Sequence, residues 1–121
     1  MHELSVAQAL VEQVEQIVQA QNAKGVSLIR VRIGALSGVV PELLGTAFSL
    51  AAAGSTAALA RLEMVEAPIR VHCQTCGTES DATANRLLCG ACGDWHTQVI
   101  SGDELILESV ELEMKEVKQN V

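Results

Sequence analysis

Hydrophobic residues recur every three or four positions near the start of the chain, in the stretch LSVAQALVEQVEQIVQA, while Glu and Gln fill the positions between them. The apolar positions are Leu4, Ala7, Val11, Val14 and Val18. This spacing places them on one face of an α-helix, so it predicts an amphipathic helix over residues 4–20. Ser5 and Gln8 have the spacing of a capping box, unless the helix starts a residue or two earlier. Asn22 and Gly25 mark its end.

The pattern then changes to a period of two. In VSLIRVRIG, residues 26–34, the side chains of Ile29, Val31 and Ile33 fall on one face. Alternation of this kind predicts a β-strand with one wet face. After a glycine-bounded loop, Pro41 is well placed in the first turn of a second helix, which runs to about Gly54.

Two further stretches alternate. The first is ARLEMVE, residues 60–66, and the second follows a turn at residues 101–103 near the end of the chain. In that last strand, the apolar residues that mostly share one face are Ile106, Val110, Leu112 and Met114. The two stretches therefore predict a second strand and a long third strand.

The order of elements is helix, strand, helix, strand, an insert with four cysteines, and a final strand. It predicts an α/β or α+β layer in which two helices cover a three-stranded sheet. The insert projects from the connection between the second and third strands. We expect one α/β domain over residues 1–67 and 99–121, and a small inserted domain over residues 68–98.

Composition and charge narrow the range of partners. The net charge is −7, which disfavours binding to nucleic-acid phosphates. No apolar run is long and uninterrupted enough to span a bilayer, and no secretory signal is visible, so we expect a cytoplasmic protein without a membrane partner. Because cytosolic thiols stay reduced, the 4 cysteines need a role other than disulfide formation.

The cysteines form two pairs with two residues between the members of each pair: Cys73 with Cys76, and Cys89 with Cys92. A tight turn with this spacing presents both sulfurs to one metal, and a glycine after each pair allows the turn to close. Four thiolates suit tetrahedral zinc, and a filled coordination sphere indicates a structural rather than a catalytic ion. The alternatives are a redox pair or an iron–sulfur site, and the glycine-following turns favour neither. The inserted domain is thus predicted to be a zinc knuckle.

Two histidines, His72 and His96, lie just outside the cysteine pairs. Either could replace a thiolate or help to hold a second metal. The alternative is that both are exposed polar residues beside the knuckle.

The chain starts Met1-His2-Glu3. The bulky second residue predicts that Met1 is retained. Its amine, the amide nitrogen of His2 and the His2 imidazole could then close two chelate rings, with the next amide or the Glu3 carboxylate completing a plane. Square-planar coordination by nitrogen and oxygen fits Ni(II) or Cu(II), and geometry does not choose between them. The alternative is a solvated terminus before a helix.

These features occur together in one known family. The MHE start, the first helix, VRIGALSGV, PELL with AF, RLEMVEAP and the CxxCG pairs resemble the HypA/HybF hydrogenase nickel-incorporation proteins, over nearly the whole chain. The resemblance implies a metallochaperone that carries Ni(II) as cargo and Zn(II) as a structural ion. His2 matches the family's nickel ligand, Met1 and Glu3 match accessory donors, and His96 lies near a histidine linked to nickel in some members. The zinc ligands would be Cys73, Cys76, Cys89 and Cys92.

The resemblance also implies which part of the chain binds each metal and which proteins are its partners. Residues 1–67 and 99–121 would bind nickel, and residues 68–98 would bind zinc. Nickel would be delivered to the precursor of the [NiFe]-hydrogenase large subunit, together with the nickel-handling GTPase HypB, and in some organisms to urease maturation. The rival hypothesis is a zinc-ribbon module that contacts another protein and has no role in nickel transfer. The sequence contains no HExxH motif and no nucleophile–base pair, so we do not expect an enzyme.

Overall fold

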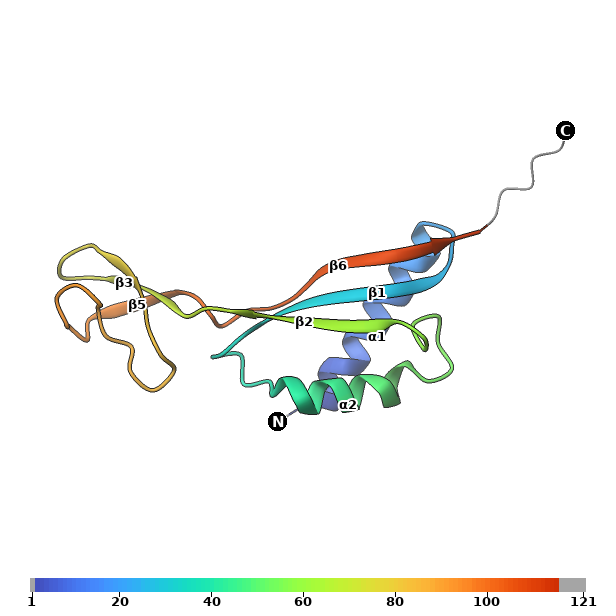
Figure 1. The fold of residues 1–121 in the computed structure, drawn as a ribbon, viewed down its shortest axis with the longest axis horizontal. Helices are drawn as coiled ribbons and strands as arrows, with labels where there is room; N and C mark the ends of the chain where they lie inside the picture. Colours follow the sequence, from blue (N-terminus) through green and yellow to red (C-terminus); the bar gives the residue numbers. More distant parts are fainter. Residues whose placement is uncertain (1, 116–121) are drawn as a thin grey trace, which may run out of the picture. The chain divides into compact units, whose positions relative to one another are not determined.

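The computed structural model describes residues 2–115 (Figure 1). One sheet has the strand order β2-β1-β6, and a second, smaller sheet has the order β4-β3-β5. The predicted α+β fold of two helices, a three-stranded sheet and an insert is confirmed. The sheet inside the insert was not predicted. The elements are α1 (Glu3–Ala20), β1 (Ala23–Gly34), α2 (Pro41–Ala52), β2 (Arg61–Ala67), β3 (Arg70–Cys73), β4 (Glu79–Asp81), β5 (Thr97–Ser101) and β6 (Leu105–Met114).

The described chain divides into two compact units. The first, called the helical unit below, contains residues 2–31, 40–63 and 107–115. The second, called the cysteine unit, contains residues 32–39 and 64–106. The strands β1, β2 and β6 each contribute residues to both units.

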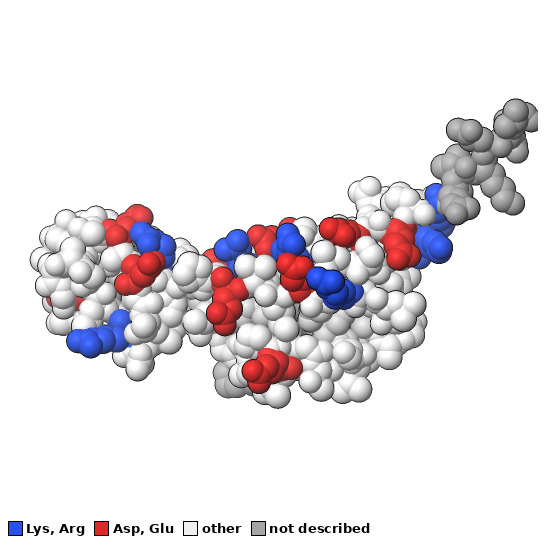
Figure 2. Space-filling view, viewed as in Figure 1, with Lys and Arg blue, Asp and Glu red and all other residues white. Residues whose placement is uncertain are grey.

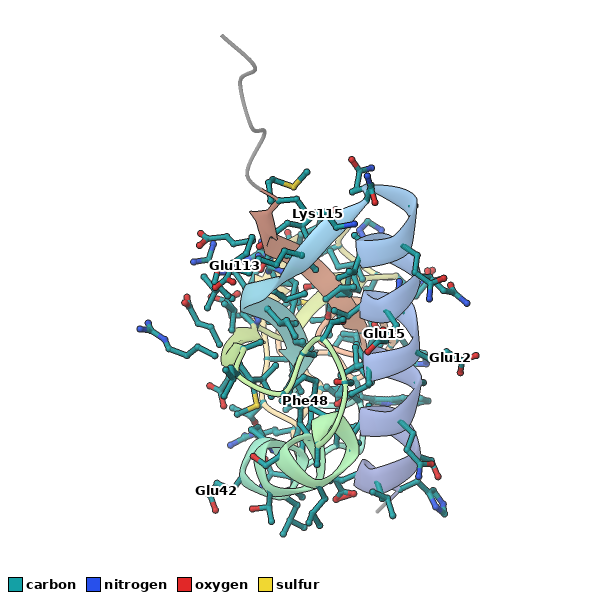
Figure 3. The ribbon with its side chains drawn as sticks, turned by 90° about the vertical axis from the view of Figure 1, so that its right-hand side faces the viewer. Glu12, Glu15, Glu42, Phe48, Glu113 and Lys115 are labelled. Carbon is teal, nitrogen blue, oxygen red and sulfur yellow. The ribbon has the colours of Figure 1, made fainter. Side chains whose placement is uncertain are left out.

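The core of the helical unit lies where α1 and α2 pack together against the sheet (Figure 1). The predicted inward face of β1 is confirmed, because Ile29 and Val31 are fully buried. Phe48 from α2 is also buried, whereas Glu12 on α1 points away from the interior (Figure 3). The apolar stripe of each helix therefore faces the sheet, as an amphipathic pattern requires. Within residues 2–115, neither helix is both long and apolar enough to cross a bilayer.

The N-terminus of α1 lies earlier than the predicted cap. The helix begins at Glu3, and His2 occupies the N-cap position without a side-chain cap in the described chain. The first helical hydrogen bond runs from the Val6 N–H to the His2 carbonyl oxygen, at 3.0 Å. The alternative of an earlier start is thus confirmed, and Ser5 and Gln8 form no capping box, because both residues lie inside the helix.

The end of α1 and the burial pattern of β6 also differ in part from the predictions. Asn22, just past the end of α1 at Ala20, has a positive φ of 50°, as expected at a helix end, but Gly25 lies inside β1. In β6, Ile106 and Met114 are exposed, although they were predicted to share one face with half-buried residues of the strand. Glu108 and Ser109 are consecutive exposed residues, so burial does not alternate strictly along β6.

Charged side chains of both signs lie over the strands of the helical unit (Figure 2). On β1 and β2, the Arg30 guanidinium is 3.0 Å from the Glu63 carboxylate. Both side chains are about a third exposed or more, so the pair contributes little to stability, but it shows that this face of β1 is wet, as predicted.

Three segments of the cysteine unit cross at two glycines. The Gly34 N–H donates to the Glu104 carbonyl oxygen at 2.7 Å, and the Leu36 N–H donates to the Gly102 carbonyl oxygen at 2.7 Å. A Cβ on Gly34 would lie 2.1 Å from the Gly102 carbonyl oxygen, and one on Gly102 would lie 2.7 Å from the Ile69 Cα. Gly102 also has a φ of 105°, which favours glycine. The crossing therefore requires glycine at both positions.

We expect Gly34→Ala to lower the free energy of unfolding by about 3 kcal/mol, because backbone atoms must move to admit the methyl group. Gly25→Ala is the matched control, since its Cβ would lie 3.6 Å from the Thr56 carbonyl oxygen, an ordinary contact. Urea denaturation of both variants with zinc present measures the difference. Equal effects of the two substitutions would show that the crossing tolerates a side chain.

Candidate metal centres

The two cysteine pairs lie on turns that are near copies of each other. The Gly77 N–H donates to the Cys73 carbonyl oxygen at 3.0 Å, and the Gly93 N–H donates to the Cys89 carbonyl oxygen at 2.9 Å. Gly77 and Gly93 have φ values of 76° and 78°. The positive φ that the sequence predicted for both glycines is confirmed, and it lets each turn close.

The same turns also tie back to the chain that follows them. The Cys73 N–H donates to the Thr78 carbonyl oxygen, and the Cys89 N–H donates to the Asp94 carbonyl oxygen, both at 2.9 Å. Cys73 is in addition the last residue of β3, which pairs with β4 and β5. The first turn is therefore anchored by a sheet, and the second by its hydrogen bonds.

The four sulfurs meet in one cluster. The Cys73 and Cys92 Sγ atoms are 3.6 Å apart, as are those of Cys76 and Cys89, and all four lie within 4.8 Å of one another. Zinc–sulfur bonds of about 2.3 Å at tetrahedral angles would place the sulfurs about 3.8 Å apart. The donor set and spacing therefore fit zinc without rearrangement of the turns.

Hydrogen bonds stabilise the thiolate form of two cysteines. The backbone N–H groups of Cys92 and Ala91 point at the Cys89 Sγ, at 3.4 and 3.3 Å, and lower the pKa of Cys89. The side chain and backbone of Thr78 lower the pKa of Cys76 to about 6. Thiolates are the form that binds metal, so both effects favour coordination.

The fourth thiol behaves in the opposite way. A backbone hydrogen bond from Asp94 lowers the pKa of Cys92, but proton sharing with the sulfur of Cys73, desolvation and the other two sulfurs raise it to about 12. Four thiolates in contact repel one another, so all four ionise together only around a cation. The cluster therefore has the chemistry of a metal site.

Asp94 joins the two turns. Its carboxylate accepts hydrogen bonds from the Thr75 hydroxyl in the first turn and from the His96 Nδ1 at 2.9 Å, and these contacts lower the pKa of Asp94. The Trp95 ring stacks on the His96 ring with a centroid distance of 3.7 Å. Sequence reasoning missed this network, because its only signal was one polar residue in or beside each turn.

Neither flanking histidine joins the sulfurs. Within residues 2–115, the group of His, Cys, Asp or Glu side chains close enough to hold a metal consists of the four cysteines. His72 lies in β3 opposite Glu79 and Gln98, and His96 is exposed beside Asp94.

The predicted terminal site lies at the start of α1. His2 is exposed, whereas Glu3 is 5% exposed and is the buried charged residue of the described chain. No buried side-chain nitrogen or oxygen in residues 2–115 lacks a hydrogen-bond partner. The start of α1 lies beside α2 (Figures 1 and 3). Met1, the third predicted donor, lies outside the described residues.

Known proteins share this sequence over most of its length. Residues 1–112 match the family model described as "Hydrogenase/urease nickel incorporation, metallochaperone, hypA". A hydrogenase maturation factor HypA of Nitrosospira multiformis is 47% identical over 112 residues, which cover 93% of this chain and 97% of the relative. The protein of the same name from Aquifex aeolicus is 41% identical over 114 residues, covering 94% of this chain and 99% of the relative.

Two solved structures share the fold. The solution structure of the Ni metallochaperone HypA from Helicobacter pylori has a TM-score of 0.70 and 25% sequence identity, covering 95% of this chain and 100% of that chain. A further solution structure of a HypA protein has a TM-score of 0.74 and 25% identity, covering 95% of this chain and 98% of that chain.

Proposed function

The chain belongs to the HypA family of hydrogenase and urease nickel-incorporation metallochaperones, and from this premise we propose that it carries Ni(II) on its first three residues and delivers it to the large-subunit precursor of a [NiFe]-hydrogenase. The observation that carries the proposal is the family match from residue 1 onward, in a chain whose second residue is an exposed histidine at a helix start.

The proposed nickel donors are the Met1 amine, the amide nitrogen and imidazole of His2, and the Glu3 carboxylate. The first helical hydrogen bond is donated by Val6, so the amide nitrogens of His2 and Glu3 precede the helical ladder. Nickel could therefore bind an amide nitrogen there without breaking a hydrogen bond of the helix. A planar set of nitrogen and oxygen donors suits Ni(II).

The position at a helix start also favours release. The N-terminal end of a helix carries a partial positive charge, which opposes a bound cation. Protons compete for the His2 imidazole and the terminal amine, so nickel affinity falls as the pH falls. Both effects suit a protein that transfers its metal rather than keeping it.

The four cysteines are proposed to hold structural Zn(II), which would join the two turns as a permanent cross-link. Cys73, Cys76, Cys89 and Cys92 would fill all four coordination positions, so no position remains for a reacting water. The proposed zinc domain is residues 68–98, and the proposed nickel domain is residues 1–67 and 99–121. His96 is a further nickel candidate, since its exposed imidazole lies outside the sulfur cluster.

The proposed partners are the nickel-handling GTPase HypB and the hydrogenase large-subunit precursor, in the cytoplasm, with urease maturation as a second client where urease is present. The protein would act by binding and transfer, not as an enzyme. The rival proposal, a zinc-ribbon interaction module without a nickel role, predicts that the first three residues are dispensable.

A cellular assay tests the proposal against this rival. In a strain lacking its own copy, the His2→Ala variant is expected to leave hydrogenase without nickel when nickel is scarce, and to recover when nickel is abundant, because uncatalysed loading then suffices. The matched control is Gln8→Ala, an exposed side chain on the same helix. Hydrogenase activity and nickel content of the large subunit are measured. Full activity of His2→Ala at scarce nickel would favour the rival.

A further inference from the structure

A hollow of about 540 Å³ lies on the cysteine unit, away from the four sulfurs. Its walls come from the loop after β1, from the end of β2 with the residues that follow, and from the residues after β4. The alanines among its lining residues are Ala35, Ala67, Ala82 and Ala84. A volume of this size lies within the range of about 300–1,000 Å³ found for binding pockets.

The walls are fixed by the backbone. Ala67, the last residue of β2, is buried, and the Ala82 N–H donates to the Ile69 carbonyl oxygen at 3.0 Å. Ala35 and Ala84 are exposed. Methyl side chains on three segments leave an open apolar surface that another backbone can approach closely.

Two carboxylates border the alanines. The Asp81 carboxylate is 2.8 Å from the Arg70 guanidinium, so its charge is partly neutralised. The Glu66 side chain is exposed and makes no ion pair or side-chain hydrogen bond among residues 2–115. The hollow therefore combines an apolar surface with one uncompensated negative charge, in a chain with a net charge of −7.

We propose that this hollow is a docking groove for an extended, basic segment of a partner protein, which places small side chains over the alanines and a Lys or Arg beside Glu66. We take the segment to be extended, because an extended chain with small side chains brings its backbone close to the methyl groups that line the hollow. Opposite charge across the contact would set the choice of partner and speed encounter. The inference goes beyond nickel transfer and does not depend on it, because the groove contains none of the proposed metal donors.

Binding of a defined probe to the full chain, with zinc present and nickel absent, tests the groove. The probe is a labelled, end-capped hexapeptide of alternating Ala and Lys, with an Ala and Glu version as its opposite. Fluorescence anisotropy gives the affinity, and backbone amide shifts give the location. Glu66→Gln is expected to weaken binding about three- to five-fold, the value of one partly exposed ion pair. Ala84→Leu fills the hollow and is expected to abolish the shifts at Ala67 and Ala82.

The matched controls are Glu79→Gln, which removes an exposed carboxylate of the same unit, and Ala53→Leu, which adds the same bulk to an exposed site on the helical unit. Neither is expected to change the affinity. Equal weakening by Glu66→Gln and Glu79→Gln would mean that net charge alone attracts the peptide, and would overturn the proposal. So would unchanged binding to Ala84→Leu, binding of the Glu peptide, or equal competition by free spermidine, which would indicate a small-cation site.

Discussion

Replacing Cys89 by serine is expected to unfold the cysteine unit while the two helices stay folded. Cys89 is buried, and its sulfur lies 3.6 Å from that of Cys76 and accepts two backbone N–H groups. Zinc binding contributes about 10–16 kcal/mol in zinc-finger peptides, which is as large as the whole stability of a typical domain, about 5–15 kcal/mol. If zinc is bound as proposed, its loss would remove the main force that holds the two turns together.

The chain allows the two units to be observed separately. Trp95 is the only tryptophan and lies in the cysteine unit, where it stacks on His96. The helices α1 and α2 both lie in the helical unit, and they dominate the far-ultraviolet circular dichroism. Cys89→Ser, or a chelator on the unmodified protein, should change the Trp95 fluorescence strongly and the helical signal little.

Ala91→Ser is the matched control, because it places a serine in the same turn without removing a sulfur. It should retain one zinc per chain by metal analysis, whereas Cys89→Ser should retain none. A cysteine unit that keeps its Trp95 signal after zinc has been removed would show that the metal is not what stabilises it. Iron in place of zinc in freshly purified protein would show that the cluster binds a different ion.

The second large effect is expected at the start of the chain. His2→Ala should weaken Ni(II) binding about a hundred-fold or more, because the loss of residues that only support a metal ligand already costs about 10- to 100-fold. A peptide extension ahead of Met1 should weaken Ni(II) binding nearly as much, since it converts the terminal amine into an amide that binds metal poorly. Titration of the zinc-loaded protein with Ni(II), followed by calorimetry, measures both.

Two controls separate the terminal chelate from other histidines. Gln8→Ala alters an exposed position of α1 and should leave nickel affinity unchanged. His96→Ala removes one of the two histidines outside the terminus, the other being His72. If His96→Ala weakened binding as much as His2→Ala, nickel would be shared between both side chains. If neither His2→Ala nor the extension changed the affinity, the terminal site would be wrong.

The features that could be predicted from the sequence depend on neighbouring residues. Pro41 begins α2 because its ring suits the first turn of a helix, and Gly77 and Gly93 have positive φ because each closes a short turn. The buried face of β1 follows from strict alternation at Ile29 and Val31. These rules need only a few adjacent positions, so they could be applied without knowledge of the fold.

The features that were missed depend on residues that are distant in the sequence. The strands β3, β4 and β5 contain only 4, 3 and 5 residues, too few for an alternation to be visible. Thr75 and Asp94 meet only because the two cysteine turns converge. Position 34 requires glycine only because the backbone of Gly102 lies against it. The N-cap position of His2 was not predicted, because histidine is not among the residues that usually cap helices.

The order of the strands has a consequence for how the protein is made. The central strand β1 pairs with β6, and a contact between them, from the Ser27 hydroxyl to the Glu111 carbonyl oxygen, joins residues 84 positions apart. On the ribosome, α1, β1 and α2 emerge long before β6, which follows the whole cysteine insert. A metal clip between the two cysteine turns would shorten the path that β6 must search, and so lower the entropy cost of its pairing. The sheet around β1 is therefore complete only after β6 has left the ribosome.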